Sequence, residues 1–444
     1  MKRPGRQNAW RKAAAWLVSP NLAPTQVVQI EKPIYGGAFL ARVEGKAVFV
    51  PLTLPGERAR VRIVEDKRGY ATAETDEIVE AAAERVAPAC PHFGSCGGCQ
   101  YQHADYAAQL AFKQAILRET LERGGVRAPE KIAVLAAEPW AYRNRIRLAF
   151  DSEGNAGYRG RQSHAVIPIA ECPIAAPRLV QAALDAAKFF RKFAVSSRPA
   201  ELSLFSNAQE DTLLASVFTS GTAQTPFVDY FDALLQEVPL IRGVELAELH
   251  QGQLPRTIAQ AGVRSLNYHA ADFDYRVDHG AFFQVNRWLV DALVDCVTDG
   301  YGGGLAWDLF AGVGLFARRL ARQFGRVIAV ESAPAAIDAL AQNLAGTSAT
   351  AVKATTLDFL RSARKGERPD LVVIDPPRTG LGADVTALLG QIAAPAMVYV
   401  SCDPATLARD LHALIGAGYA VEHVTLTDLF PQTFHLETVV RLRR

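Results

Sequence analysis

The sequence predicts an α/β protein whose C-terminal part, residues 271–444, is a doubly wound, Rossmann-like domain. From about Asp272, short and nearly continuous apolar runs alternate with helical patterns, which is typical of a parallel sheet covered on both faces. The expected strands are Ala306–Leu309, Arg326–Val330, Leu371–Ile374 and Met397–Val400. The helices expected to follow them are, in the same order, Leu315–Gln323, Ala333–Leu344, Val385–Ile392 and Ala405–Ile415. The last stretch, Val421–Leu442, indicates two further strands around Pro431.

Two other regions precede this domain. Between residues 19 and 77, short strands separated by Gly and Pro turns predict a small five-stranded β-barrel. These strands are Val27–Ile30, Ala38–Val43, Ala47–Val50, Arg58–Glu65 and Ala71–Ile78. Residues 78–270 indicate a central α+β domain with a strand at Arg145–Phe150, and a helix within residues 104–125 that we expect to pack on the C-terminal domain.

Composition limits the class of protein. The chain has 444 residues, 49% of them hydrophobic, and a formal net charge of +2. That balance argues against a surface coated in phosphate-binding charge but allows a local basic groove. No apolar run reaches the roughly 18 residues of a membrane span, so we expect a cytoplasmic protein without membrane contact. We also expect a monomer. The basic extension at residues 1–18 indicates either a disordered start or an arm that touches RNA phosphates.

Four candidate chemical side chains follow the strands of the C-terminal domain. Asp308, Glu331, Asp375 and Cys402 each stand at or just after the end of one expected strand. Ligands of open α/β sheets bind at the carboxyl ends of the strands. The sequence therefore predicts that these four residues share one crevice.

The turn after the first of these strands favours a nucleoside cofactor. Gly312 and Gly314 let the backbone approach a ligand, and the helix that follows offers free amides. With Glu331 at the spacing of a ribose-binding acid, this motif fits S-adenosylmethionine and NAD equally well. The motif Asp375-Pro376-Pro377-Arg378 favours S-adenosylmethionine over NAD. Its prolines hold the chain stiff, so the Asp375 carboxylate and nearby carbonyls are presented to a ligand, which suits the edge of a planar base. A dehydrogenase has no evident use for such a motif.

Two residues near the end of the chain are candidates for catalysis. Cys402 lies between a strand and a helix, where the helix N-terminus favours thiolate, while Asp403 as a helix cap opposes this. Glu437 lies in an apolar stretch, where burial raises the pKa of a carboxyl and makes it a general base. His435 is an alternative base that the sequence does not exclude.

A separate group of cysteines indicates a metal site. Cys90, Cys96 and Cys99 stand within ten residues, and Cys172 is the sensible fourth partner. Four thiolates suit zinc or an iron–sulfur cluster, and the spacing leans toward a [4Fe–4S] cluster because it lacks the paired CxxC of a zinc ribbon. Cys296, on the apolar face of a helix, is expected to be inert.

Arginines with aromatic neighbours recur in the central region. Arg143, Arg145 and Arg147 alternate, so they share one face of a strand, with Tyr158 and Arg159 nearby. Such a face suits phosphates and stacked bases, and it also suits a solvated surface strand.

Taken together, these motifs resemble the RNA 5-methyluridine methyltransferases of the 23S rRNA (uracil-5-)-methyltransferase type. The resemblance runs from about residue 19 and begins with a TRAM-like barrel. It then includes the four cysteines, Ala281–Asn286, Asp308–Gly314, Ile374–Arg378, Ser401–Pro404 and Phe430–Glu437. It implies a class I methyltransferase domain that binds S-adenosylmethionine, a [4Fe–4S] cluster on Cys90, Cys96, Cys99 and Cys172, and an RNA substrate, with rRNA favoured over tRNA.

The resemblance also implies roles for single residues. Cys402 is the expected nucleophile and Glu437 the expected base, while the cofactor-binding residues are expected to be Gln284, Asp308, Phe310, Gly312, Gly314, Glu331 and Asp375. The chain departs from the pattern at Leu315, where some members have Asn, and Thr355 or Asp358 is a candidate for a further cofactor contact. The competing hypotheses are a NAD-dependent iron–sulfur oxidoreductase and a catalytically silent RNA-binding protein.

Overall fold

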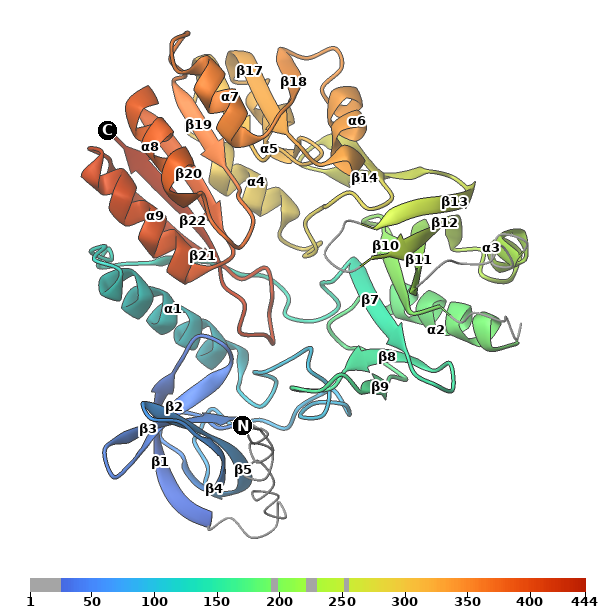
Figure 1. Cartoon of the computed structure of the whole chain (residues 1–444), viewed down its shortest axis with the longest axis vertical. Helices are drawn as coiled ribbons and strands as arrows, with labels where there is room; N and C mark the ends of the chain where they lie inside the picture. Colours follow the sequence, from blue (N-terminus) through green and yellow to red (C-terminus); the bar gives the residue numbers. More distant parts are fainter. Residues whose placement is uncertain (1–24, 193–198, 221–229, 251–254) are drawn as a thin grey trace, which may run out of the picture. The chain divides into compact units, whose positions relative to one another are not determined.

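The computed structural model describes residues 25–192, 199–220, 230–250 and 255–444 (Figure 1). The chain divides into two compact units, Met1–Arg85 and Val86–Arg444. The basic extension expected at residues 1–18 lies outside the described residues. None of the helices that the structure describes has the length and apolarity to cross a membrane.

The first unit is a closed five-stranded β-barrel, as the sequence predicts. Its strands, in the order β1-β2-β3-β5-β4, are β1 (Thr25–Pro33), β2 (Ala38–Val43), β3 (Lys46–Pro51), β4 (Arg58–Asp66) and β5 (Tyr70–Glu80). Apolar residues alternate into its interior, among them Phe39 and Val50 with no exposed surface. On the outside, arginines of β4 pair with acids of β5, as in Arg62–Glu74 at 2.8 Å, so this basic row is already matched in charge.

The second unit contains a seven-stranded sheet with the order β13-β12-β11-β10-β7-β8-β9. Its strands are β7 (Arg145–Phe150), β8 (Ala156–Arg159), β9 (Val166–Pro168), β10 (Glu201–Ser206), β11 (Leu213–Ser220), β12 (Ile241–Leu249) and β13 (Arg256–Gly262). Helices α2 (Pro177–Lys192) and α3 (Phe231–Glu237) cover it through a core that includes Phe189, Leu204 and Leu246. The strand expected at Arg145–Phe150 is confirmed.

The same unit contains an eight-stranded sheet with the order β18-β17-β16-β19-β20-β22-β21-β6. Its strands are β6 (Ala133–Leu135), β16 (Gly303–Leu309), β17 (Phe324–Glu331), β18 (Ala349–Lys353), β19 (Leu371–Ile374), β20 (Ala396–Ser401), β21 (Ala420–Thr427) and β22 (Glu437–Arg443). β22 runs antiparallel to its neighbours β20 and β21. The predicted strands of the doubly wound domain are therefore confirmed, whereas β18 was not predicted.

Helices lie along this sheet (Figure 1). They are α4 (Val290–Thr298), α5 (Leu315–Leu320), α6 (Pro334–Asn343), α7 (Thr356–Ala363), α8 (Gly382–Ile392) and α9 (Pro404–Gly416). A two-stranded hairpin, β14 (Ser265–Ala270) and β15 (Phe273–Asp278), packs against α6. The sequence predicts all of these helices except α7.

One further helix, α1 (Tyr106–Arg123), packs against α9. Its N-cap Asp105 accepts a hydrogen bond from the Ala108 amide at 2.7 Å, which satisfies one free donor of the first turn. At its other end the two helices approach so closely that a Cβ at Gly124 would lie 2.6 Å from the Cβ of Ala408. Glycine is therefore required where α1 ends on α9.

Candidate active site

The strand register places Cys402, Glu437 and Asp375 at one edge of the eight-stranded sheet. Ser401 of β20 pairs with Thr438 of β22, so Cys402 and Glu437 are the residues next to that pair. β22 is antiparallel, and its first residue therefore lies at the same edge as the carboxyl ends of the parallel strands. Asp375 follows directly after β19, whose last residue pairs with Tyr399 of β20.

A pocket beside these residues contains several of the predicted cofactor contacts. Gln284, Phe310, Gly312 and Asp375 line it, together with the apolar side chains of Phe282, Phe283, Val313, Leu315 and Phe316. Leu315 thus presents a hydrocarbon wall where the family resemblance offers an amide in some members. A narrow, mostly apolar pocket with a few polar groups is the usual form of a cofactor site.

The turn from β16 to α5 gives this pocket its shape. Phe310 adopts φ 64° and Gly314 φ 92°, both in the left-handed region. A non-glycine residue such as Phe310 is uncommon and strained in this region, and the surrounding structure has to hold it there. Glycine is favoured at Gly314 by its φ of 92°, and a Cβ there would also lie 2.8 Å from Leu340 Cδ1, whereas a Cβ at Gly312 would meet nothing within 4 Å.

Glu331 is fixed next to this turn by backbone amides. Its Oε2 accepts a hydrogen bond from Gly312 N at 2.8 Å, and its Oε1 accepts from Ser332 N and Ala333 N, both at 2.6 Å. These bonds hold the carboxylate at the end of β17 in one orientation. The carboxylate can therefore serve a ligand without having to be ordered by it.

Asp308 faces inward rather than into the pocket. It is fully buried, and its Oδ2 accepts a hydrogen bond from Ala317 N at 2.8 Å in the first turns of α5. Burial raises the pKa of Asp308 to about 8, and the Ala317 amide opposes this. The structure thus places Asp308 behind the Gly312 turn, where it supports the turn, and not among the residues that line the pocket.

Cys402 is half-buried and carries an unusually basic thiol. Burial raises its pKa to about 12, and the negative charges of Glu437 and Asp375 add to this, while Arg378 opposes it. Asp403 caps α9, with its Oδ1 accepting from Ala405 N at 3.0 Å and Thr406 N at 2.9 Å. Desolvation and the neighbouring carboxylates thus outweigh the tendency of the helix N-terminus to favour thiolate.

Glu437 and Asp375 share this site as a pair of buried acids. Burial raises the pKa of Glu437 well above its usual value, the charge of Asp375 adds to this, and Arg378 opposes it. Burial also raises the pKa of Asp375 to about 7. Two buried carboxyls that repel one another titrate as a pair, and both pKa values are raised above those of exposed acids, which strengthens each as a base.

Arg378 is a site residue to which the sequence analysis gave no role. It ends the Asp-Pro-Pro-Arg motif, and its guanidinium lies 3.2 Å from Nδ1 of His435. Burial lowers the pKa of His435 to about 4, and the charge of Arg378 adds to this. His435 is therefore neutral and accepts a hydrogen bond from Arg378. The position of Arg378 at the end of this motif could have indicated its role, because its charge lowers the pKa of Cys402, His435 and Glu437.

Two residues suggested for the cofactor lie elsewhere. Thr355 is the N-cap of α7 and accepts from Asp358 N at 3.1 Å, while its own hydroxyl donates to Asp358 Oδ2 at 2.7 Å. Both side chains are thus used in starting a helix, and neither lines the pocket.

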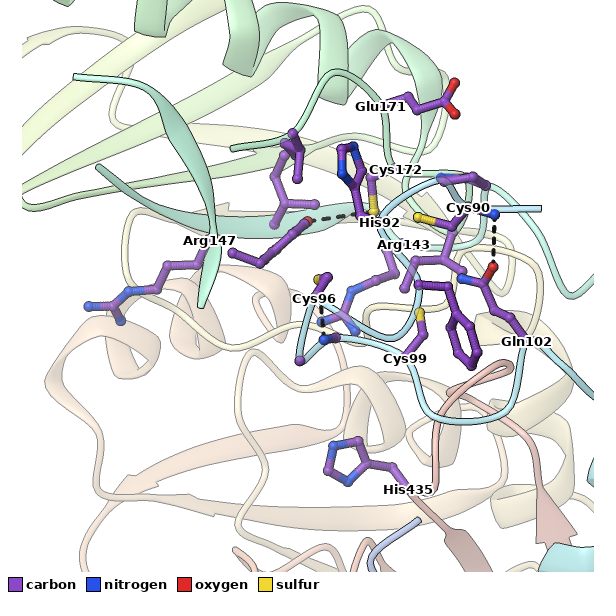
Figure 2. Close-up of a pocket in the computed structure, with 18 residues that line it drawn as sticks. Cys90, His92, Cys96, Cys99, Gln102, Arg143, Arg147, Glu171, Cys172 and His435 are labelled. Carbon is purple, nitrogen blue, oxygen red and sulfur yellow. Dashed lines mark hydrogen bonds between the residues drawn. The ribbon is translucent and has the colours of Figure 1, made fainter. Parts of the chain in front are cut away.

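The four clustered cysteines line a second pocket. Figure 2 shows Cys90, Cys96, Cys99 and Cys172 around this space, with Arg143 beside them and His435 at its edge. Gly98 N donates to Cys96 Sγ at 3.4 Å, and the Tyr158 hydroxyl donates to Cys172 Sγ at 3.8 Å. In the described part of the chain, no three His, Cys, Asp or Glu side chains are close enough together to hold a single metal ion.

The arginines of β7, Arg145 and Arg147, contact other side chains of the protein. The guanidinium of Arg145 lies 4.3 Å from the ring of Phe205, and burial lowers its pKa to about 10. That of Arg147 lies 4.2 Å from the ring of Phe218, and its Nε is 2.5 Å from Glu201. Alternation does place Arg145 and Arg147 on one face of β7, whereas Arg143 precedes the strand and lines the cysteine pocket. Cation–π contacts and an ion pair occupy Arg145 and Arg147, so they offer RNA less free charge than the pattern suggested.

Comparisons with known proteins agree with this arrangement. Residues 259–444 match the family model of tRNA (Uracil-5-)-methyltransferase, and residues 24–75 match the TRAM domain. The chain is 35% identical to an Azoarcus protein named 23S rRNA (uracil(1939)-C(5))-methyltransferase RlmD, over 95% of this chain and all of that protein. It is 34% identical to an uncharacterized RNA methyltransferase of Streptomyces avermitilis, over 94% of this chain and 97% of that protein.

A solved structure also matches the fold. The crystal structure of Pyrococcus abyssi tRNA (uracil-54, C5)-methyltransferase in complex with S-adenosyl-L-homocysteine superposes with a TM-score of 0.74. It covers 94% of this chain and all of that chain, at 23% identity. The methyltransferase fold is thereby confirmed, together with the TRAM barrel.

Proposed function

The chain belongs to the family of S-adenosylmethionine-dependent RNA (uracil-5-)-methyltransferases with a TRAM domain, and from this membership we propose that it methylates C5 of a uridine in 23S rRNA through a covalent bond to Cys402. The observation that carries the chemistry is the meeting of Cys402, Glu437 and Asp375 at one sheet edge. Family membership excludes the NAD-dependent alternative.

The pocket fits S-adenosylmethionine. Glu331 is not among the residues that line the pocket, but its Oε2 accepts from the amide of Gly312, which does line it, so we assign Glu331 to the ribose hydroxyls. Gln284 and Phe310 line the pocket next to Asp375. When bound there, S-adenosylmethionine supplies an electrophilic methyl group and a positive sulfonium charge.

The residues of the chain then have distinct tasks. Cys402 loses its proton to solvent, and its sulfur adds to C6 of the uracil, which makes C5 enolate-like. C5 accepts the methyl group, and Glu437 takes the proton from C5. The electron pair of that C–H bond re-forms C5=C6 as the sulfur–C6 bond breaks. The products are 5-methyluridine, S-adenosylhomocysteine and one proton.

Glu437 is favoured over His435 as the base. Burial and the charge of Asp375 raise the pKa of Glu437, which makes its carboxylate a stronger base, whereas burial lowers the pKa of His435 to about 4. His435 Nδ1 is also occupied by Arg378 at 3.2 Å. A neutral, weakly basic imidazole with one nitrogen engaged suits a positioning role better than proton removal.

The RNA substrate is tested by competition between two transcripts. Several relatives are named for 23S rRNA, whereas the matching family model and the solved structure are named for tRNA. We expect unmodified 23S rRNA incubated with labelled S-adenosylmethionine to yield labelled 5-methyluridine, and an unmodified tRNA pool to yield none. Label that enters tRNA alone would establish the second candidate function, methylation of a tRNA uridine.

We also propose that Cys90, Cys96, Cys99 and Cys172 hold a [4Fe–4S] cluster. The four thiols line one pocket, and two of the sulfurs accept hydrogen bonds, as cluster sulfurs do. When bound, the cluster would supply a cross-link between the segment of Cys90–Cys99 and Cys172.

The metal content tests this assignment. Protein purified without oxygen is expected to be brown and to contain about four iron and four sulfide per chain. Cys99→Ser should lose most of the iron, whereas Cys296→Ser, a matched change on α4 away from the pocket, should retain it. Stoichiometric zinc without iron, or equal iron in both variants, would contradict the proposal.

A further inference from the structure

Residues 428–436 form an irregular segment between β21 and β22, which we name the catalytic loop because it leads directly into Glu437. The loop is largely buried, with Leu429, Gln432 and Thr433 having 2% exposure or less. Gln432 adopts φ 69°, a left-handed conformation that is strained for a residue other than glycine. A buried, strained backbone must find its hydrogen-bond partners in surrounding structure.

Several of those partners come from the segment that carries the clustered cysteines. The amides of Gln100 and Tyr101, which directly follow Cys99, both donate to Gln432 O at 3.0 Å. The side-chain oxygen of Gln100 accepts from Phe434 N at 3.3 Å. The cysteine segment and the catalytic loop are thus joined by main-chain hydrogen bonds.

Helix α1 adds a reciprocal pair of amide contacts. Gln109 Nε2 donates to Gln432 Oε1 at 2.9 Å, and Gln432 N donates to Gln109 Oε1 at 3.0 Å. Gln109 Nε2 also donates to Ala104 O at 2.9 Å, which fixes the direction of the amide. Gln109 therefore holds the strained residue of the loop through both its backbone and its side chain.

One turn further along α1, Lys113 makes a buried ion pair with the start of the loop. Lys113 Nζ lies 2.6 Å from Asp428 Oδ1 and donates to Phe430 O at 2.9 Å, and neither charged side chain is exposed. The Tyr106 hydroxyl donates to the other oxygen, Asp428 Oδ2, at 2.9 Å. A buried charge pair with these extra hydrogen bonds tolerates few alternative geometries, so it specifies where the loop begins.

The loop ends at the site chemistry. It carries His435, whose Nδ1 meets the guanidinium of Arg378, and the next residues are the buried Leu436 and Glu437. Arg378 in turn acts on the charge of both Glu437 and Cys402. Displacement of the loop around Gln432 therefore changes the surroundings of Glu437. The start of the loop is held separately by Asn286, whose Nδ2 donates to Leu429 O at 3.2 Å and which follows the Phe282–Gln284 segment of the cofactor pocket.

We propose that Gln109 and Lys113 of α1 are positioning residues that hold the catalytic loop so that Glu437 can take the C5 proton. This inference rests on the proposed function. Proton removal follows methyl transfer, so a misplaced loop slows the last step more than the first. The methylated covalent adduct between Cys402 and RNA should then accumulate during turnover, a result that general destabilisation of the fold does not produce.

The test compares Gln109→Leu with Gln114→Leu. Gln114 lies on the same helix, but its side chain donates to Ile132 O at 3.0 Å and does not reach the loop. Each variant is mixed with RNA and methyl-labelled S-adenosylmethionine, quenched in denaturant, and the label that remains attached to protein is measured. For Gln109→Leu we expect kcat to fall by about 10²-fold and protein-bound label to rise, with KM for S-adenosylmethionine within about twofold of the parent. Gln114→Leu should match the parent.

Two further variants keep the result decisive. Gln432→Gly removes only the side-chain half of this pair, because the backbone amide of residue 432 can still donate to Gln109 Oε1, so it should accumulate adduct to a smaller extent than Gln109→Leu. Glu437→Gln should accumulate it whatever the loop does, because it removes the base itself. If Glu437→Gln accumulates adduct but Gln109→Leu and Gln432→Gly do not, the positioning role is refuted while the proposed function stands. If Glu437→Gln accumulates none, the assignment of the base fails, and the positioning role with it.

Discussion

Replacing Cys402 by alanine is expected to abolish methyl transfer to RNA, with kcat lowered on the order of 10⁴-fold or more. Without the thiol no bond forms at C6, and C5 of uracil is too weak a nucleophile to accept the methyl group. Binding of S-adenosylmethionine should be nearly unchanged, because Cys402 does not line the cofactor pocket. Labelled-methyl incorporation and equilibrium dialysis with the cofactor measure the two effects separately.

Cys296→Ala supplies the matched control for this loss. Cys296 is also a half-buried cysteine, but it lies on α4 and packs against the core. Burial raises its pKa, as it does for Cys402, so the two thiols differ chiefly in what surrounds them. Activity that survives in Cys402→Ala, or that is lost equally in Cys296→Ala, would show that Cys402 is not the nucleophile.

Glu437→Gln is expected to lower kcat by about 10²- to 10⁴-fold, the usual contribution of a general base. The kcat of the parent should rise with pH as Glu437 loses its proton. The pH at which this rise occurs should be higher than for an ordinary glutamate, because burial and Asp375 raise the pKa of Glu437. The kcat of the variant should not show this rise with pH. A kcat measured between about pH 5 and 9 in both proteins checks this, with the apparent pKa assigned to the Glu437–Asp375 pair.

Stability separates this loss from unfolding. The pKa of Glu437 is raised in the folded protein, so the folded state binds its proton more tightly than the unfolded state does. Folding stability therefore falls as the pH rises from the unfolded to the folded pKa. Replacing the carboxyl by an amide removes that cost, and Tm at neutral pH should be equal to or above that of the parent. A variant that is less stable and keeps its activity would contradict the role of Glu437.

Much of the fold could be predicted because local sequence patterns, namely apolar runs and Gly-bounded strands, specify its elements. Apolar runs at β16, β17, β19 and β20 and the Gly-bounded strands of the barrel lie close to their predicted positions. β18 and α7 were missed for physical reasons. β18 reads Ala-Thr-Ala-Val-Lys, with one large apolar residue, and is specified by parallel pairing to β17. α7 has eight residues and depends on its Thr355 cap and on packing.

Strand ends predicted one crevice for Asp308, Glu331, Asp375 and Cys402, because parallel strands share one carboxyl edge, and the structure brings Asp375 and Cys402 to that edge. Glu437 was proposed from its apolar surroundings and the family resemblance, and it reaches the same edge because β22 runs antiparallel. The basicity of Cys402 could not be predicted, since it depends on burial and on carboxylates from other strands. The role of Asp308 was missed for the same reason, because the sequence does not show that its carboxylate turns toward Ala317. The support of the loop by α1 joins residues more than 300 positions apart.

The covalent bond between Cys402 and uracil is the central claim, and trapping it is the most direct test. RNA in which uridine is replaced by 5-fluorouridine should be methylated once and then remain attached, because fluorine at C5 cannot leave as a proton does. Mass spectrometry of the digested complex should place the nucleotide on the peptide that contains Ser401-Cys402-Asp403. A nucleotide on any other peptide, or full methylation of ordinary RNA without a trapped complex, would contradict the account.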